Sequence, residues 1–330
     1  MQGPAEITNL HVITQAGAES LCVATRTTAS GIQPVLVRFY GDQSRHGGEL
    51  VRNEFEITRK LCVPGVLKPI AMLDAEKPPV LVFDWLDLAP LRPTPIGHPW
   101  EASLVLHVAR QLLVVAGRLH TQGILHLAIN PFNLLAQHVP DEGRGPMVFL
   151  SGFGHAVPSG DFQRKPDYRR LPREFIPYLS PEQTGRTGFS PDERSDYYSI
   201  GAVLYELVSA KTPVPTGEVE ETVYAILTKP PIDLQLVRSD ISPALSAIIM
   251  RLLAKDPEDR YQSAGQILRD LHGGEGRTAA HQPVTPHGSC PHRTSPIGRS
   301  MGVQFVGRDR GRLPRDRCAG RTRAGWRREK

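Results

Sequence analysis

The segment HLAINPFN, residues 126–133, lies between a long helical stretch and a run of strand-forming residues. Residues 100–123 before it carry apolar side chains at helical spacing and end at Gly123, which predicts an amphipathic helix. Residues 146–154 after it, PMVFLSGFG, have strand character up to the glycines. The segment therefore follows a long helix within a short strand-rich stretch, and its third residue is Ala128.

Strand-like runs dominate the chain before the long helix. Three of them are separated by turn residues, and two more follow a stretch with helical spacing at residues 49–61. The five runs are LHVITQ (10–15), SLCVATRT (20–27), PVLVRFY (34–40), VLKPIAMLDA (66–75) and PPVLVFDWLD (78–87). Five strands and one helix predict a small, mainly antiparallel layer.

Helices dominate the chain after the strand-rich stretch. The run SDYYSIGAVLYELVSA, residues 195–210, predicts an apolar helix with Ser195 as its N-cap and Asp196 in its first turn. Residues 242–256 and 263–272 predict two more helices, each opened by a serine. Together the two halves predict an α+β protein with a β-rich part followed by a larger helical part.

The net charge of +5 comes from the C-terminal end of the chain. Residues 308–330 hold ten Lys or Arg and three Asp or Glu, a local charge of +7, so the remainder sums to −2. The chain as a whole is therefore not expected to bind nucleic acid.

The sequence gives little support for a metal site, a redox motif or a membrane protein. The four cysteines form no CxxC pair, and Cys290 with His292 supplies only two candidate ligands. No uninterrupted apolar run reaches the roughly 18 residues that a membrane span needs. Because the N-terminus also lacks a signal pattern, a reducing, cytoplasmic setting is expected.

Several short motifs resemble those of the protein-kinase fold. VLVR (35–38) stands where kinases have V-A-I-K, and Glu54 occupies the helix position that pairs with that basic residue. HLAINPFN stands where the catalytic loop H-R-D-x-x-x-x-N belongs, GFG (152–154) replaces D-F-G, and SPE (180–182) matches A-P-E. The resemblance implies a two-lobed protein-kinase-like fold with its interlobe cleft near Phe83 to Leu88.

A narrower resemblance lies in PYLSPEQTGR (177–186) and IIMRLLAKDPEDRYQSA (248–264). These segments look like the serine/threonine-kinase-like domain that opens large multidomain signalling proteins of bacteria and fungi. In that family an AAA-type ATPase domain, a sensory module and often a histidine kinase follow. VQFVGRDR (303–310) is similar to the opening of that ATPase domain, but no apolar helix follows it.

The resemblance implies three regions. Residues 1–88 form the N-lobe, residues 89–272 form the C-lobe, and residues 273–330 form a disordered linker and a basic tail. The tail has two interpretations: the chain is a truncated or frame-shifted form of a longer protein, or the tail is natural and binds acidic surfaces.

Two groups that phosphate transfer requires are missing. In kinases a loop aspartate accepts the proton of the substrate hydroxyl, and the D-F-G aspartate and a loop asparagine hold magnesium. Ala128 and Gly152 replace the two aspartates, which leaves Asn133 as one weak, neutral metal ligand. Ser151 and Asp161 are close in sequence, but neither has the family's position.

Nucleotide binding is implied only in a weak form. Arg38 replaces the strand lysine; it keeps the positive charge, but its planar fork places the donors differently. Gly17 is the only glycine in the first loop, where the family would have three. Magnesium is therefore a doubtful ligand. The residues implied in weak ATP binding are Arg38, Glu54, Asp84, Trp85 and Asn133.

Residues that build the large lobe of a kinase are retained. Glu182 and Arg260 match a buried ion pair, and Asp196 matches the residue that anchors the catalytic-loop backbone. The matching scaffold positions are His126, Phe153, Gly154, Glu182, Asp196, Gly201 and Arg260.

The scaffold residues of a kinase are retained, but the two catalytic aspartates are missing. This combination predicts a pseudokinase that acts as a regulatory and binding module in signal transduction. Loss of a positioned base costs about 10²–10⁴ in rate. The alternatives are a divergent serine/threonine kinase that uses ATP and compensating residues, and a non-functional fragment. The partners are unknown proteins, with downstream ATPase and sensor domains as candidates in a longer relative and no membrane expected.

Overall fold

The structure is a computed structural model, which describes residues 6–28, 31–40, 46–74, 79–91, 98–137, 145–160 and 167–278. Asp161, Cys290, His292 and the basic tail lie outside the described residues, so the predictions made for them stay untested.

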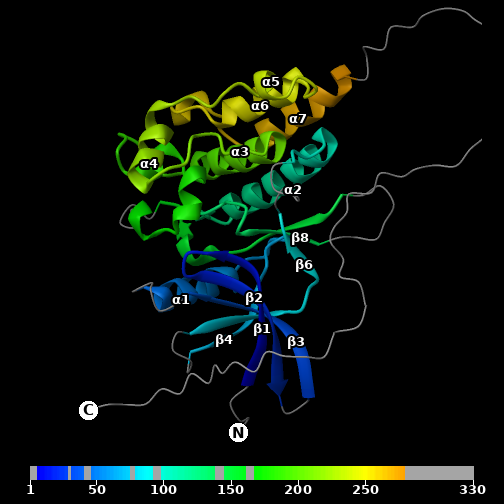
Figure 1. Ribbon diagram of the computed structural model, residues 1–330, viewed down its shortest axis with the longest axis vertical. Helices are drawn as coiled ribbons and strands as arrows, with labels where there is room; N and C mark the ends of the chain where they lie inside the picture. Colours follow the sequence, from blue (N-terminus) through cyan, green and yellow to red (C-terminus); the bar gives the residue numbers. More distant parts are fainter. Residues whose placement is uncertain are drawn as a thin grey trace, which may run out of the picture. The chain divides into compact units, whose positions relative to one another are not determined.

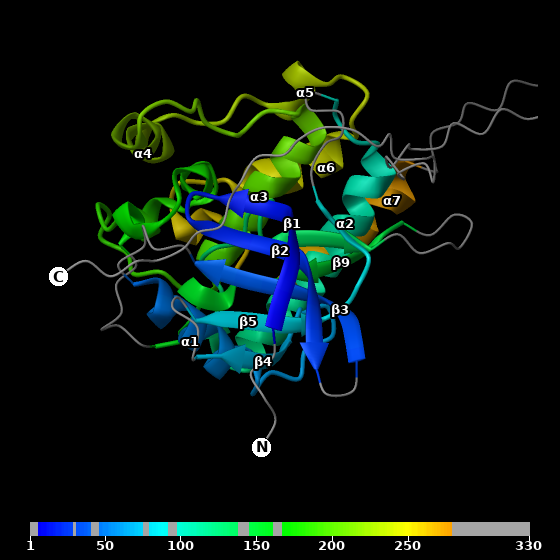
Figure 2. The same cartoon turned by 60° about the horizontal axis from the view of Figure 1, so that its bottom comes forward.

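A five-stranded antiparallel sheet in the order β1-β2-β3-β5-β4 forms the N-lobe (Figures 1 and 2). Its strands are β1 (Glu6–Ala16), β2 (Glu19–Thr28), β3 (Gly31–Tyr40), β4 (Pro69–Leu73) and β5 (Val80–Asp84). Alternate residues of β3 enter different apolar clusters, Leu36 and Tyr40 in one and Val35 and Val37 in the other. Because strand side chains alternate in direction, Arg38 shares the face of Leu36 and Tyr40.

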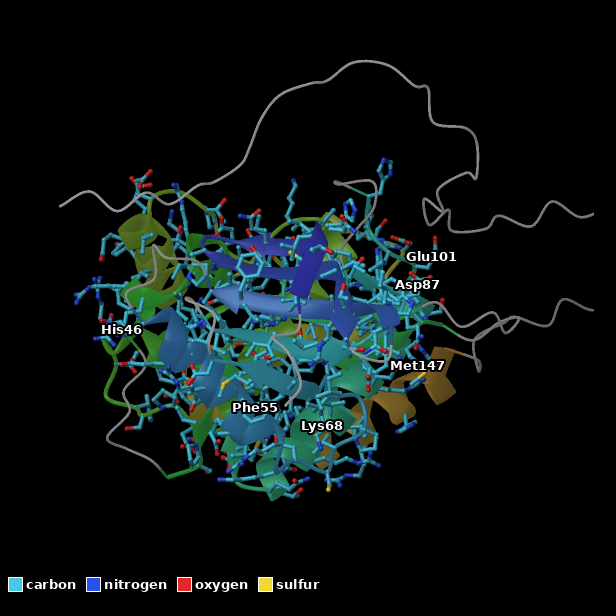
Figure 3. The ribbon with its side chains drawn as sticks, turned by 90° about the horizontal axis from the view of Figure 1, so that it is seen from below. His46, Phe55, Lys68, Asp87, Glu101 and Met147 are labelled. Carbon is cyan, nitrogen blue, oxygen red and sulfur yellow. The ribbon has the colours of Figure 1, made fainter. Side chains whose placement is uncertain are left out.

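Helix α1 (Gly47–Thr58) packs against that face of the sheet (Figure 3, where Phe55 marks the helix). Val51, Glu54 and Thr58 are buried at spacings of three and four residues, which places them on one side of the helix. A carboxylate therefore stands on the buried, mainly apolar face of α1.

Helices form most of the C-lobe. They are α2 (Ala102–Thr121), α3 (Glu193–Ser209), α4 (Val219–Thr228), α5 (Leu234–Val237), α6 (Pro243–Leu252) and α7 (Ala264–Thr278). One small sheet joins β6 (Leu88–Pro90), β8 (Leu134–Gln137) and β9 (Met147–Leu150), and another joins β7 (Ile124–Leu125) and β10 (Val157–Pro158). Short 3-10 helices cover Phe153–His155, Tyr168–Arg170, Arg173–Tyr178, Pro181–Thr184 and Pro257–Asp259.

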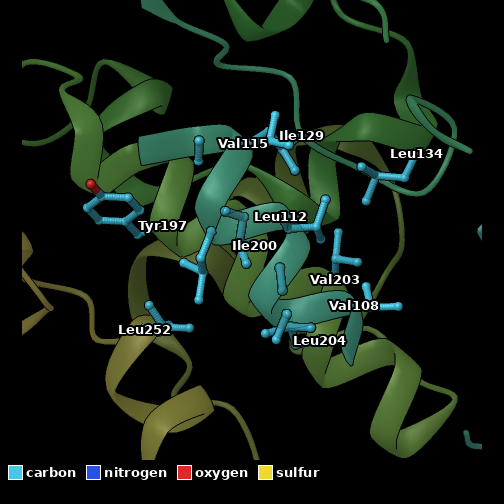
Figure 4. Close-up of a cluster of buried hydrophobic side chains, with 14 of the residues drawn as sticks. Val108, Leu112, Val115, Ile129, Leu134, Tyr197, Ile200, Val203, Leu204 and Leu252 are labelled. Atoms are coloured by element: carbon cyan, nitrogen blue, oxygen red, sulfur yellow. The ribbon is translucent and has the colours of Figure 1, made fainter. Parts of the chain in front are cut away.

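The core of the C-lobe lies where α2, α3 and α6 meet. Leu112 of α2, Ile200 and Leu204 of α3, and Leu252 of α6 belong to one buried cluster (Figure 4). Burying such side chains stabilises the fold by about 1.5–3 kcal/mol each. Ile129 belongs to the same cluster, so the segment of residues 126–133 rests on this apolar core.

Helix α2 is long and apolar enough to cross a membrane by length and composition, with a mean hydropathy of 1.4 over its best window. The sequence showed no uninterrupted apolar run of that length. Helix α2 nevertheless meets the criteria of length and mean hydropathy, although it contains Arg110 and Arg118. Here its apolar face, which includes Val105 and Leu112, is buried in the C-lobe core.

The α+β, two-lobed prediction is confirmed, but three details of the helices were wrong. The helix expected over residues 242–256 ends at Leu252. The N-cap of α3 is Asp192 rather than Ser195. Ser195 instead completes a capping box, in which its Oγ accepts a hydrogen bond from the backbone N–H of Asp192 over 3.2 Å. Helix α7 continues to Thr278, beyond the expected end at His272. Glycine lowers helix propensity by only about 1 kcal/mol per residue, so the glycines after His272 do not end the helix.

Candidate functional site

The guanidinium of Arg38 lies where the two lobes meet. Only 2% of this side chain is exposed. Nη1 donates a hydrogen bond to Asn133 Oδ1 over 3.2 Å, and Nη2 donates one to Ser151 Oγ over 2.8 Å. Nε lies 3.7 Å from Glu54 Oε1, which is longer than a hydrogen bond. One N-lobe side chain is thus bonded to two segments of the C-lobe.

Glu54, on the buried face of α1, has other hydrogen-bond partners than Arg38. Tyr40 Oη donates to its Oε2 over 3.0 Å, and the backbone N–H of Gly152 donates to its Oε1 over 3.2 Å. The carboxylate therefore links the helix to both β3 and the GFG segment. These donors supply the compensation that a buried charge requires.

Asp196 of α3 holds the loop that contains residues 126–133. Its carboxylate accepts from the backbone N–H groups of His126 and Leu127 over 2.9 and 2.8 Å, and His120 Nε2 lies 2.9 Å from it. Leu127 has a φ of +57°, which side chains rarely adopt. The paired N–H bonds stabilise this turn and so fix the position of Ala128.

Ala128 is buried in an apolar contact between the lobes. It is 3% exposed and clusters with Ala16, at the end of β1, and with Phe175 of the C-lobe. Gly17 follows Ala16 at the β1–β2 turn, where a Cβ atom would meet Pro172 Cβ at 3.4 Å. The β1–β2 turn therefore packs against the C-lobe beside the cluster that contains Ala128.

Gly152 has a left-handed conformation, with φ of +77°, and is packed tightly against Asn133. A Cβ atom at residue 152 would lie 2.1 Å from Asn133 Oδ1. Asn133 cannot easily move aside, because its Nδ2 donates to Ala128 O over 3.0 Å while its Oδ1 accepts from Arg38. The arrangement therefore requires glycine at position 152.

A family model described as the protein kinase domain matches residues 28–271. The chain belongs to the protein kinase family. The match covers both lobes, from the end of β2 to α7, and members of this family take the phosphate that they transfer from ATP, generally with magnesium.

Similar curated proteins include serine/threonine-protein kinase Pkn1 of Myxococcus xanthus, 30% identical over 251 residues, which are 75% of this chain and 35% of that protein. Serine/threonine-protein kinase PknB of Mycolicibacterium smegmatis is 28% identical over 240 residues, 69% of this chain and 36% of that protein. The hybrid signal transduction histidine kinase G of Dictyostelium discoideum is 39% identical over 111 residues, 33% of this chain and 3% of that protein. The kinase domain thus corresponds to about a third of the two bacterial relatives.

The residues of this kinase cleft do not fit a magnesium ion. Hard divalent cations need several oxygen ligands and favour carboxylates. Gly152 offers no side chain, and Asn133 Oδ1 already accepts from the Arg38 guanidinium. The described residues contain no group of three or more His, Cys, Asp or Glu that could hold a metal. The nearby positive charge of Arg38 further disfavours a cation at this point.

Apolar side chains of the two lobes also pack together in the cleft. Leu21 and Leu36 of the N-lobe sheet belong to the same cluster as Leu135 of the C-lobe, and all three have no exposed surface. At the other end, Ala16 and Ala128 share a buried cluster with Phe175. A bound nucleotide would have to separate these contacts and expose apolar surface.

The pKa values of the cleft agree with a structural role for its polar groups. Burial lowers the pKa of His126 to about 4, although Asp196 acts in the opposite direction, so its ring is neutral near pH 7. Both ring nitrogens are engaged, Nδ1 with Ala128 N–H and Nε2 with Ser151 O. His126 is therefore not placed to replace the missing base.

Arg38 is positively charged and Tyr40 is neutral in the cleft. Burial acts to lower the pKa of Arg38, but Glu54, and after it Tyr40 and Glu19, leave this pKa raised overall. Burial and then Glu54 raise the pKa of Tyr40 well above its usual value, so the phenol stays a donor.

The scaffold positions named from the resemblance are buried, most of them in the C-lobe. Arg260 donates to both carboxylate oxygens of Glu182 over 2.7 and 2.9 Å, and both side chains are at most 2% exposed. A Cβ at Gly201 would lie 2.7 Å from Leu252, and the ring of Phe153 packs 4.6 Å from that of His126. A Cβ at Gly154 would lie 2.5 Å from the Tyr40 hydroxyl.

The structure brings together five of the residues singled out in the sequence, namely Arg38, Glu54, Ala128, Asn133 and Gly152. Asp84 and Trp85 lie at the end of β5, where their side chains are exposed, and Trp85 is 42% exposed. Only their backbone could serve a ligand in the cleft.

Sequence reasoning missed Glu19 and His155, and it named Ser151 without the role that the structure gives it. Ser151 accepts from Arg38, and its position beside Gly152 was the only signal for it. Glu19 of β2 lies 2.9 Å from His155 Nε2, just after the GFG segment, and these residues are 136 positions apart. No local pattern indicates such a pair.

Proposed function

We propose that this kinase domain is a pseudokinase, a regulatory and binding module of signal transduction that does not transfer phosphate. The observation that carries the proposal is the burial of Ala128 between Ala16 and Phe175. A substrate hydroxyl would meet a methyl group at this position instead of a carboxylate, and the lobes close over it.

The missing base and the missing metal site are independent losses. A positioned base contributes about 10²–10⁴ in rate, and charge stabilisation at the transferred phosphate is a further requirement. The Asn133 amide is the one retained metal ligand of the family, and it is bonded to Arg38 and to Ala128 O. Weak ATP binding remains a prediction from the sequence, which the packing of Leu21, Leu36 and Leu135 disfavours.

Similarity to a hybrid signal transduction histidine kinase supports a place in signalling. The resemblance of residues 303–310 to the start of an ATPase domain points the same way. On this proposal the partners are proteins or further domains that recognise the closed lobes, and the setting is the cytoplasm.

A divergent active kinase is the second candidate. The proximity of Arg38 to Glu54 favours it, because the same pair exists in active kinases as lysine and glutamate. Under this alternative Arg38 would contact the phosphates of ATP.

Transfer of radiolabelled phosphate from ATP by the purified full chain distinguishes the two candidates. The pseudokinase proposal predicts no incorporation into the chain or a generic acceptor protein above that of heat-unfolded protein. Incorporation that Arg38→Ala abolishes and Arg52→Ala leaves intact would contradict it. Arg52 is a suitable control because it forms a half-exposed pair with Asp74 on the N-lobe surface.

A further inference from the structure

The Arg38 guanidinium directs its hydrogen bonds at the C-lobe and not at its expected partner. Nη1 and Nη2 donate to Asn133 Oδ1 and Ser151 Oγ, over 3.2 and 2.8 Å. Its Nε, 3.7 Å from Glu54, makes no hydrogen bond. A strand residue whose function was to pair with α1 would direct its donors at Glu54.

The two acceptors are neutral oxygens at the point where the family holds its metal. Asn133 is the retained metal-ligand position, and Ser151 directly precedes Gly152, which replaces the metal-binding aspartate. Each acceptor is itself fixed: Asn133 Nδ2 donates to Ala128 O, and Ser151 Oγ is 3.1 Å from Asn133 O. The acceptors are therefore organised around a cation that the chain itself supplies.

Charge balance in the cleft is consistent with a cation at this place. Glu54 is fully buried, Glu19 is 7% exposed, and both act on Arg38 electrostatically. Glu19 also faces His155, across the same joint between the lobes. A buried cation here offsets carboxylates that would otherwise stand in a low-dielectric interior.

We propose that the Arg38 guanidinium is a resident cation that holds the two lobes closed, in the place where active kinases use a metal-bound nucleotide. The inference rests on the proposed function and adds its regulation: the closed form needs no ligand. A partner then meets one fixed surface, whatever the concentration of ATP or magnesium.

Hydrogen exchange followed by mass spectrometry on the full chain tests this inference. The segments to follow are residues 16–20, at the β1–β2 turn, and 150–154, with α3 as an internal reference. Arg38→Met, which keeps much of the side-chain volume, is expected to raise exchange in both segments by about tenfold or more and to leave α3 unchanged. Arg52→Ala serves as the matched control and is expected to change neither segment.

Ser151→Ala separates the interlobe bonds from the pair with Glu54. This variant removes one acceptor of the guanidinium and leaves Arg38 and Glu54 in place, so the inference predicts faster exchange in both segments. If only the pair with Glu54 mattered, exchange in Ser151→Ala would equal that of the wild type. That result, or wild-type protection in Arg38→Met, would overturn the proposal.

Replacing the missing guanidinium with a small soluble guanidinium tests the role of the cation itself, because it does not restore the lost packing of the side chain. In Arg38→Ala, 10 mM methylguanidinium chloride is expected to restore part of the protection, while the same concentration of sodium chloride is not. Equal effects of the two salts would overturn the proposal. Phosphate transfer by the wild type bears instead on the proposed function, so the two failures can be told apart.

Discussion

A Cβ atom at Gly152 would lie 2.1 Å from Asn133 Oδ1, which is closer than any non-bonded contact allows. Glycine at this position is therefore part of the packing of the cleft as well as a missing metal ligand. Changes at residue 152 must displace Asn133 and, through it, the bonds to Arg38 and Ala128 O.

Gly152→Asp is expected to destabilise the fold strongly. Overpacking in a well-packed interior costs about 1–3 kcal/mol, and a left-handed φ adds about 1 kcal/mol for a residue with a side chain. Gly160 is a matched control, since its φ is +86° and a Cβ there would meet nothing within 4 Å. Chemical denaturation of both aspartate variants measures the difference, and equal losses would show that residue 152 is not tightly packed.

Restoring both aspartates is not expected to restore phosphate transfer. In Ala128→Asp/Gly152→Asp the carboxylates are present, but the new side chain at position 152 displaces Asn133, and position 128 still lies in the buried cluster with Ala16 and Phe175. The radiolabelled-phosphate assay checks this, provided that circular dichroism shows the variant folded. Recovery of activity in this double variant would mean that the cleft opens readily.

Arg260→Ala is expected to cost about 3–5 kcal/mol of the free energy of unfolding, because it leaves the buried carboxylate of Glu182 without its partner. Arg173→Ala is the matched control, since its pair with Glu218 is mostly exposed and contributes roughly 1 kcal/mol or less. Urea unfolding of both variants gives the comparison. Similar losses in the two would contradict a structural role for the buried pair.

His126 is expected to make stability depend on pH between about 6.5 and 4. Burial lowers its pKa to about 4, so in that range the unfolded chain binds a proton that the folded chain does not. Stability is therefore full above pH 6.5 and falls as the pH falls, by about 3 kcal/mol from this residue.

His126→Gln is the variant that tests this pH dependence. Its unfolding free energy is expected to change less between pH 6.5 and 4 than that of the wild type. Parallel pH profiles of the two proteins would show that another group carries the dependence.

Much of the fold could be predicted from local sequence patterns. The strand-forming run at residues 34–40 lies in β3, and the helical spacing of apolar residues at 49–61 corresponds to α1. Burial of one face imposes a repeat of two residues on a strand and of 3.6 residues on a helix. Helix ends were less certain. Asp192 and Ser195 are both good capping residues, and the three-dimensional contact decides which one caps α3.

The candidate site could be predicted only where motifs have fixed positions. Arg38, Glu54, Asn133 and Gly152 were found in this way. The bonds between them join residues far apart in the chain, such as Arg38 and Asn133, which are 95 positions apart. The closure of Ala16 over Ala128 likewise depends on how the lobes meet, and no local pattern contains that information.

The most direct test of the central claim is a thermal-shift titration of the full chain with ATP, with and without magnesium chloride. Ligand that binds the folded state alone raises stability by RT ln(1 + [L]/Kd), so binding appears as a rise in Tm. A closed, metal-free cleft predicts no saturable rise under either condition. A saturable rise without magnesium would contradict the closed cleft, and a rise that requires magnesium would contradict the assignment as a pseudokinase.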